Sequence, residues 1–336
     1  MKKAFSCANT GLRALSGALG RVGMSPVSFA AFVMLALIPV IFSNNEYIIR
    51  LSVSCLIFGT LAMGFDLSAG FIGVPNWGYA SLMGLGCYTS ALLQSNFGIT
   101  PWIGMIVSGF AATLIGFLIA FLTLRMDGVF AALLSWFVGI ILMTVIAAMP
   151  QITRGAMGLR VEPLFETPWA TPYFYVIFGI CIIAFMCLKL ITKSHLGLAF
   201  LTLGQDMEAA RTSGISPLRY RTINFIISCF IGGVVGGFYA HFVCILTPNV
   251  LSTKNTVQVL VLAYIGGRGS IWGPLLAAFI ILPIFESMNS LLELKYIIYG
   301  VLLILVMIFF PGGLSSLLRK AKDFCVQKIG PLLGQR

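Results

Sequence analysis

The stretch PWIGMIVSGFAATLIGFLIAFLT, at residues 101–123, is 23 residues long and contains no charged side chain. About 20 apolar residues in a helix span the hydrocarbon core of a bilayer. Arg125 and Asp127 follow directly, and a second apolar run then covers residues 128–149. Two apolar runs separated by two charged residues predict two membrane-spanning helices joined by a tight turn.

Further runs of this kind lie on both sides of that pair. Together they predict an all-α integral membrane protein with about ten transmembrane helices. The ten runs cover residues 27–43, 48–66, 72–94, 101–123, 128–149, 170–191, 221–246, 255–267, 273–291 and 295–311. Because 72–94 is rich in glycine and 255–267 is short, these two are the weakest candidates for a full crossing.

The composition supports the same class. Hydrophobic residues make up 59% of the 336 residues and charged residues 9%, whereas a soluble domain carries about 25% charged residues. This excludes a soluble globular protein, a disordered chain and a nucleic-acid-binding module. The net charge of +11 is typical of a membrane protein whose Lys and Arg collect in cytoplasmic loops.

The distribution of basic residues predicts the orientation. With the N-terminus inside and ten crossings, 16 of the 21 Lys and Arg residues fall on the cytoplasmic side and both termini are cytoplasmic. The five basic residues then placed outside are Arg50, Arg154, Arg160, Lys254 and Lys295.

Three parts are expected along the chain. Residues 1–26 form a cytoplasmic N-terminal segment, 27–313 the transmembrane domain, and 314–336 a basic cytoplasmic tail. Within the first part, four apolar residues share one helical face and predict a short helix lying on the inner membrane surface. These residues are Leu12, Leu15, Leu19 and Val22.

Arg268 determines how residues 255–285 are divided. One continuous helix would bury this charge in lipid, at a cost of about 2.5–3.5 kcal/mol or more. The sequence Gly266-Gly267-Arg268-Gly269-Ser270 instead predicts a turn on the cytoplasmic side, with Gly266, Gly267 and Gly269 as its structural residues. Glycine pairs at 232–233 and 236–237 predict close helix packing.

The sequence favours transport over catalysis. It contains no phosphate-binding loop, no Ser/His/Asp set and no paired carboxylates at a catalytic spacing. Its eight cysteines form no CxxC pair, and two histidines do not provide a metal site, so no metal is expected. His241 fits a hydrogen bond to a neighbouring helix or a proton relay, while Asp66 and Glu286 are expected near helix ends within reach of water.

The third run contains candidates for the transport pathway. Its glycines and Pro75 can unwind the helix and expose its backbone to a solute. Asn76, Trp77 and Tyr79 lie in this segment. Packing is the alternative role for each of the three.

The loop at residues 192–220 predicts a short helix. Asp206 can cap a helix that starts at Met207, and Glu208 can pair with Arg211 one turn later. Gly214 is suited to the left-handed residue that ends such a helix. The small pair Ala209-Ala210 is expected on the surface of this helix, which is too short to be stable by itself.

The pattern Glu208-Ala209-Ala210-x3-Gly214 resembles the EAA motif of ABC importer permeases. Together with its context, it is similar to the branched-chain amino acid permease family, and the resemblance covers residues 50–315. The other similar stretches are Ser194-x2-Gly197-x-Ala199, Gly64–Tyr88, Tyr239–Pro248 and Gly266–Pro274. The ending Phe310-Pro311-Gly312-Gly313-Leu314 resembles the M-type subunit rather than its H-type partner.

The resemblance implies a multi-pass permease subunit in a bacterial inner membrane. Such a subunit moves a small polar solute, here branched-chain or related amino acids, into the cytoplasm by alternating access. It implies a second, H-type permease subunit, two cytoplasmic ATPases and a periplasmic binding protein, surrounded by membrane lipid and without nucleic acid. The chain itself then binds no cofactor and is no enzyme, because ATP is hydrolysed by its partners. Glu208, Ala209, Ala210 and Gly214 would couple the chain to an ATPase.

Two departures from the family pattern leave the solute open. Where the family usually has Thr-Gly-Gly-x-x-Gly, this chain has Thr-Arg-Gly-Ala-Met-Gly at 153–158; where it has Gly-Phe-Gly-Glu, this chain has Trp-Phe-Val-Gly at 136–139. Related permeases carry other amino acids, small amides or urea. A sugar-type permease, a stand-alone secondary transporter or channel, and a membrane-embedded enzyme are the alternative classes.

Overall fold

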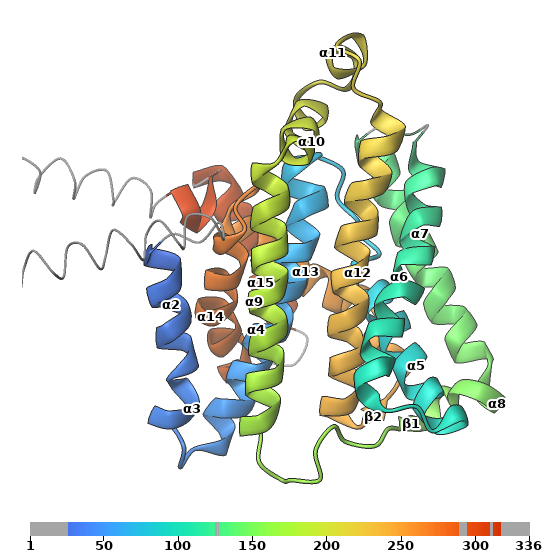
Figure 1. Ribbon diagram of the computed structural model, residues 1–336, viewed down its shortest axis with the longest axis vertical. Coiled ribbons are helices and arrows are strands. Elements are labelled where there is room, and N and C mark those ends of the chain that lie inside the picture. Colours follow the sequence, from blue (N-terminus) through green and yellow to red (C-terminus); the bar gives the residue numbers. More distant parts are fainter. Residues whose placement is uncertain (1–25, 125, 127, 289–293, 310–311, 317–336) are drawn as a thin grey trace, which may run out of the picture.

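The computed structural model describes residues 26–124, 126, 128–288, 294–309 and 312–316. These residues form a bundle of long helices that run approximately along one axis (Figure 1). The expected surface helix in residues 1–26, the turn at Arg125 and Asp127, and most of the basic tail lie outside the described residues.

Helices make up most of the described chain. The first half contains α2 (Pro26–Ala36), α3 (Ile38–Ile41), α4 (Glu46–Asp66), the π-helix η1 (Leu67–Phe71), α5 (Tyr79–Phe97), α6 (Pro101–Thr123), α7 (Gly128–Ala148), α8 (Pro150–Thr153), the 3₁₀ helix η2 (Gly155–Met157) and β1 (Leu159–Arg160). The second half contains α9 (Thr171–Lys193), α10 (His195–Gln205), α11 (Met207–Thr212), α12 (Pro217–Val243), β2 (Ile245–Leu246), the 3₁₀ helix η3 (Pro248–Leu251), α13 (Thr253–Gly266), α14 (Trp272–Ser287) and α15 (Leu294–Phe309).

Each expected apolar run contains a helix among the described residues. Among the described residues, five helices are long and apolar enough to cross a membrane: α4 with η1, α6, α7, α9 and α12. The first run is divided into α2 and α3, and the remaining four runs form the shorter helices α5, α13, α14 and α15. The chain is therefore an all-α membrane protein, and ten crossings with both termini inside stay a prediction.

Local sequence explains several helix boundaries. α6 and α12 each have proline in the first turn, Pro101 and Pro217, where the missing N–H costs no helical hydrogen bond. Asn45 caps α4, because its side chain accepts a hydrogen bond from the Ile48 N–H. Gly98 ends α5 in the left-handed conformation, at φ 61°.

The bundle has two distinct ends (Figure 1). α10 and α11 project from one end, called here the α11 end, and α8 with the β1–β2 pair lies at the other, called the β end. β1 and β2 pair antiparallel, with Leu159 opposite Leu246. This ladder fixes the loop after α8 to the end of α12.

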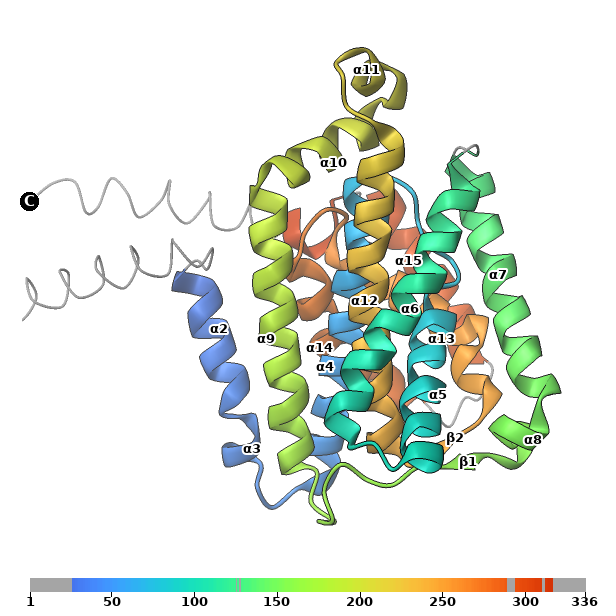
Figure 2. The same cartoon turned by 45° about the vertical axis from the view of Figure 1, so that its right-hand side comes forward.

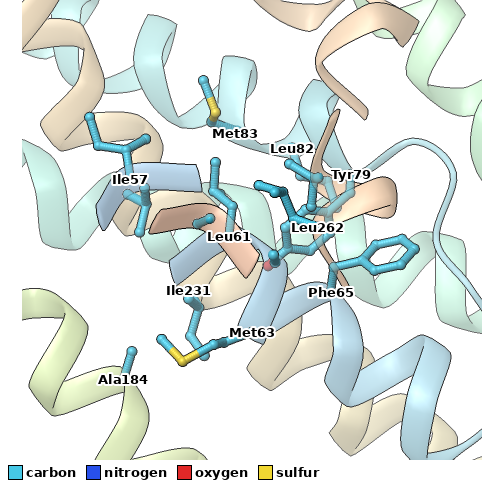
Figure 3. Close-up of a cluster of buried hydrophobic side chains, with 14 of the residues drawn as sticks. Ile57, Leu61, Met63, Phe65, Tyr79, Leu82, Met83, Ala184, Ile231 and Leu262 are labelled. Atoms are coloured by element: carbon cyan, nitrogen blue, oxygen red, sulfur yellow. The ribbon is translucent and has the colours of Figure 1, made fainter. Parts of the chain in front are cut away.

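The core surrounds α4 and α12. In their most apolar stretches, 72% and 67% of the residues are buried, against 28% for α7 and 33% for α9. Figure 3 shows how side chains from several helices meet along α4. They include Leu61 and Phe65 of α4, Met83 of α5, Ile231 of α12 and Leu262 of α13. The hydrophobic interior is therefore built from elements distant in sequence.

The outer helices carry large exposed apolar side chains. Phe110 and Leu114 on α6 are 63% and 69% exposed, and Phe130 on α7 is 72% exposed. Soluble monomers rarely expose extended apolar surfaces of this kind. These faces are suited to contact with lipid acyl chains.

Glycines allow α12 to approach its neighbours closely. A Cβ atom at Gly233 would collide with the Ser108 carbonyl of α6, and one at Gly236 with the Met83 carbonyl of α5. The expected packing role of the glycine pairs is confirmed. At this spacing a backbone can approach only a residue without a side chain.

The predicted division at Arg268 is also confirmed. α13 ends at Gly266 and α14 begins at Trp272. Gly267 and Gly269 between them have φ values of 110° and 72°, which residues with a Cβ rarely adopt. A Cβ at Gly267 would also collide with the Gly312 carbonyl, so residues 312–316 pack directly on this turn.

Candidate functional site

α11 forms a capped helix at one end of the bundle, as the sequence predicts. The Asp206 carboxylate accepts hydrogen bonds from the N–H groups of Glu208 and Ala209, at 2.9 and 3.0 Å. The Arg211 guanidinium lies 3.1 Å from the Glu208 carboxylate. Gly214 follows with φ 82° and ends the helix. The result is a six-residue helix that extends beyond the bundle (Figure 2).

Only one alanine of the expected surface pair is exposed. Ala209 is exposed, whereas Ala210 is 4% exposed, so the prediction for Ala210 is wrong. Adjacent positions on a helix point about 100° apart, and the carbonyl of Ala210 accepts a hydrogen bond from the Ile215 N–H, at 3.0 Å. The loop after α11 therefore folds back on the Ala210 side of the helix.

α10 connects α11 to the membrane helices. Ser194 caps α10 by accepting a hydrogen bond from the Leu196 N–H, and a Cβ at Gly197 would collide with the Thr192 backbone. At its far end, Gly204 packs against the backbone of Phe71 in η1. A movement of α11 can thus reach α9 and η1 through direct backbone contact.

η1 continues α4 and ends against the glycine turn. Asp66, expected near water, is instead 1% exposed, so that prediction is wrong. Its Oδ1 accepts a hydrogen bond from the Gly269 N–H, at 3.0 Å. A Cβ at Gly70 would collide with the Gly269 nitrogen. Asp66 is buried because its carboxylate lies between η1 and the glycine turn. Glu286, the other acid expected to reach water, is exposed.

The predicted helix break in the third run is present. Residues 72–78 are irregular and α5 begins only at Tyr79. The Trp77 N–H donates to Ser135 Oγ of α7, at 3.0 Å, and the Tyr79 hydroxyl donates to the Ser228 carbonyl of α12, at 2.8 Å. The break is thus held between α7 and α12.

A second broken segment meets the first. After α12 the chain forms β2 and η3 before the short helix α13 begins. Ala80 N–H donates to Thr256 Oγ1 of α13, at 3.2 Å, and Ser81 Oγ donates to the Leu251 carbonyl of η3, also at 3.2 Å. The first turns of α5 and α13 therefore lie against each other inside the bundle. Discontinuous helices of this kind often form solute sites in transporters.

Two buried N–H groups lie beside this junction. Asn76 is 1% exposed, and its Oδ1 accepts a hydrogen bond from the Gly78 N–H. Within the described residues, Asn76 Nδ2 and Trp77 Nε1 are buried without an acceptor. Tyr79, in contrast, is fully engaged by Ser228. The sequence predicts the same two roles for Asn76, Trp77 and Tyr79. In the structure Tyr79 is a packing residue, whereas Asn76 and Trp77 each retain a buried N–H donor.

His241 connects the membrane helices to the β end. It is buried, with Nε2 2.8 Å from Ser90 Oγ on α5 and Nδ1 2.9 Å from the Glu162 carbonyl. This confirms the predicted hydrogen bond to a neighbouring helix. Glu162 Oε2 in turn accepts from Gln94 Nε2, at 2.8 Å. The loop after β1 is thereby fixed to α5 and α12.

The sequence reasoning missed two features of this region. Arg154, in the segment that departs from the family pattern, adopts the left-handed conformation at φ 56°, which is uncommon for a residue with a side chain. A glycine at this position, as in the family pattern, would carry no such strain. Arg154 and Arg160 also line an open cavity of about 620 Å³ at the β end. The other missed feature is the hydrogen bond between Asp66 and the glycine turn. The sequence around Asp66 contains no signal for it, because Gly269 is about 200 residues away.

The fold and these contacts define a multi-pass helical membrane protein with broken inner helices and a projecting short helix. The family described as "branched-chain amino acid transport system / permease component" matches residues 47–307. The chain belongs to this family, and it is a multi-pass membrane permease.

Individual relatives agree with the family assignment. The chain is 27% identical to the high-affinity branched-chain amino acid transport system permease protein LivM of Escherichia coli (strain K12), over 79% of this chain and 69% of that protein. Its identity to LivH of the same organism is 24%, over 76% and 90%. The nucleoside ABC transporter permease protein NupC of Lactococcus lactis is 27% identical over 50% of this chain and 59% of its own length. No solved structure matches the chain.

Proposed function

We propose that the chain is a transport subunit of an ATP-driven importer, carrying branched-chain or related amino acids into the cytoplasm by alternating access. Its partners would be an H-type permease, two ATPases and a periplasmic binding protein. The observation that carries this proposal is α11: a capped helix with the EAA spacing that projects from the bundle and reaches η1 through α10.

In this proposal, α11 docks on an ATPase at the cytoplasmic end. The exposed side of the helix presents Ala209, with its small side chain, to a groove. Gly214 sets the direction in which the chain leaves the helix, because it has φ 82°. Closure of the ATPases would then move α10 against η1 and the glycine turn.

Uptake measurements test the coupling. Membrane vesicles containing the chain and its co-expressed partners should take up labelled leucine only with ATP. Gly214→Pro should abolish uptake while the chain remains inserted, because proline cannot adopt a positive φ. Glu208→Ala is the matched control and should retain most activity. Normal, ATP-dependent uptake by Gly214→Pro would refute the coupling role, and uptake without ATP would favour a stand-alone carrier.

A topology experiment tests the orientation. Reporters at Ser213 and Arg160 should be cytoplasmic and periplasmic, respectively. Ser213 follows α11 and Arg160 belongs to β1, two elements at opposite ends of the bundle, and the basic residues are asymmetrically distributed. A periplasmic signal at Ser213 would contradict the proposed orientation.

We further propose that the junction of α5 and α13 lines the solute pathway. Asn76 Nδ2 and Trp77 Nε1 would donate hydrogen bonds to a polar group of the solute. Trp77→Phe removes one donor and retains an aromatic ring. It should raise the KM for uptake, whereas Trp102→Phe, at an exposed position on α6, should not. An unchanged KM in Trp77→Phe would exclude the indole N–H from solute binding.

A nucleoside is the second candidate solute, because relatives named as nucleoside or guanosine permeases match about half of the chain. Leucine, guanosine and ribose should therefore be compared in the same uptake assay. Preferential uptake of guanosine would replace the amino-acid assignment and leave the importer class intact.

A further inference from the structure

An open cavity of about 720 Å³ lies at the α11 end, apart from α11 and from the α5–α13 junction. Its walls come from the last turn of α9, from the turn between α13 and α14, and from residues 312–316. Three segments separated by more than forty residues of sequence thus enclose one concave surface. Its two lysines, Lys189 and Lys193, lie outside the short motifs that resemble the family.

Basic side chains from two of these segments converge on the cavity. Lys189 and Lys193 line it from α9, and Arg268 lines it from the glycine turn. The two lysines are four residues apart on one helix, a spacing at which like charges repel. An anion between them would convert this repulsion into attraction.

The Arg268 side chain is held at the edge of the cavity by two contacts. Its Nη2 donates to the Ala69 carbonyl, at 3.4 Å, and its guanidinium lies 5.4 Å from the centre of the Tyr264 ring. No acidic side chain of the described residues lines the cavity. Asp66, beneath the turn, interacts electrostatically with Arg268 and offsets part of its charge, but three cations line the cavity. The cavity is therefore electropositive.

A hydroxyl group adds a donor beside the cations. Ser270 lines the cavity, and its Oγ accepts a hydrogen bond from the Gly273 N–H, at 3.2 Å. Its hydroxyl hydrogen can therefore be donated outward. Ser315 also lines the cavity but donates to the Gly312 carbonyl, at 3.1 Å. Two lysines, one arginine and one hydroxyl donor match the oxygen atoms of a phosphate group.

The surroundings of the cavity are apolar. Trp272, at its edge, packs with Phe185 of α9 and Phe32 of α2, with ring centroids 4.7 and 5.0 Å away. Further from the cavity, Ile183 on α9 and Ile280 on α14 are 64% and 51% exposed. Ile183 and Ile280 offer acyl chains an apolar surface farther along the two helices that border the cavity.

We propose that this cavity binds the phosphate of an anionic membrane phospholipid through Lys189, Lys193, Arg268 and Ser270. The lipid headgroup would connect α9 to the glycine turn, and its acyl chains would lie along α9 and α14. The proposal rests on the proposed orientation, which places this end at the cytoplasmic membrane surface. A bound lipid would then stabilise the region against which α10 and η1 move.

Trp272 provides a direct probe. Bromine atoms on an acyl chain quench tryptophan fluorescence on contact, and the Trp272→Phe protein gives the background from the other four tryptophans. The full chain should be reconstituted in phosphatidylcholine vesicles that contain brominated phosphatidylglycerol or brominated phosphatidylcholine. Brominated phosphatidylglycerol should quench Trp272 preferentially. Its relative affinity should fall about fivefold for each cation removed in Lys189→Gln, Lys193→Gln and Arg268→Gln.

Arg219→Gln is the matched control. Arg219 is an exposed cation in the first turn of α12, at the same end of the bundle, and it does not line this cavity. Its removal should leave the preference for phosphatidylglycerol unchanged. An equal loss in Arg219→Gln and in the cavity variants would show general surface attraction and overturn the proposal.

A second binding experiment distinguishes a lipid from a soluble phosphate. Inorganic phosphate should bind the detergent-solubilised chain much more weakly than the lipid binds, because it lacks acyl chains. Binding of inorganic phosphate together with equal quenching by the two brominated lipids would identify a soluble phosphate as the ligand and overturn the lipid assignment. Equal quenching without phosphate binding would overturn the site itself. Uptake is measured separately, so failure here leaves the importer proposal standing.

Discussion

α11 and α12 are neighbours in the sequence and are stabilised in opposite ways. α12 has 27 residues, and its glycines bring it into backbone contact with α5 and α6. α11 has six residues, and an aspartate cap and an exposed ion pair provide its local stabilisation. Substitutions in α12 should therefore impair folding, whereas those on the exposed side of α11 should impair coupling to the ATPase.

The largest effect is expected at Gly236. Valine there would collide with the Met83 carbonyl of α5, and overpacking of this kind costs about 1–3 kcal/mol or more. Gly236→Val should therefore reduce the amount of folded protein extracted from membranes several-fold. Gly179→Val on α9, where no atom lies within 4 Å of a built Cβ, is the control. Equal monodisperse peaks for both variants in size-exclusion chromatography would contradict the packing argument.

Gly267 should be almost as sensitive. Valine would require a φ of 110° and would collide with the Gly312 carbonyl; the left-handed conformation alone costs about 1–2 kcal/mol. Gly267→Val should lower the thermal unfolding midpoint in detergent clearly. Arg268→Leu, at an exposed position next to it, should insert normally. Similar midpoints for the two variants would show that the turn is not conformationally demanding.

Asp66 links α4 to the same turn and permits a finer test. Asp66→Ala removes the carboxylate that accepts a hydrogen bond from the Gly269 N–H, at an expected cost of about 1–3 kcal/mol. Asp66→Asn retains an oxygen acceptor and should be the milder change. The unfolding midpoints of both proteins provide the measurement, and a midpoint of Asp66→Asn at or below that of Asp66→Ala would contradict the role of the hydrogen bond.

Ala209 and Ala210 allow folding and coupling to be tested separately within one helix. Ala210→Trp should disturb the local fold, since Ala210 is buried, and should increase proteolysis of the loop around α11. Ala209→Trp should leave proteolysis unchanged and reduce ATPase pull-down and solute uptake. A loss of uptake with increased proteolysis in both variants would indicate that α11 tolerates no bulk on either side.

The smallest effect is expected at Glu208. Its ion pair with Arg211 is largely exposed, with 75% of the Glu208 side chain accessible, and such pairs contribute about 0.2–1 kcal/mol. Glu208→Ala should change the unfolding midpoint little and retain most uptake. A complete loss of uptake would assign Glu208 a direct contact with the ATPase.

Parts of the candidate site were predictable because local rules determine them. The cap at Asp206, the ion pair of Glu208 with Arg211 and the positive φ of Gly214 depend on neighbours within a few residues, and the structure contains all three. The unwound start of the third run also follows from local composition. The exposure of Ala210 and Asp66 was predicted wrongly, because burial depends on segments that the local sequence does not contain.

The sequence alone determined the membrane class, the positions of the apolar helices and the division at Arg268, because each depends on the cost of placing charge or unpaired backbone groups in lipid. Only the tertiary structure showed that the starts of α5 and α13 meet, that Asp66 caps a turn about 200 residues away, and that Lys189, Lys193 and Arg268 share one cavity. These contacts arise from packing between helices far apart in the chain, and periodicity along a single helix carries no information about which helix lies beside it.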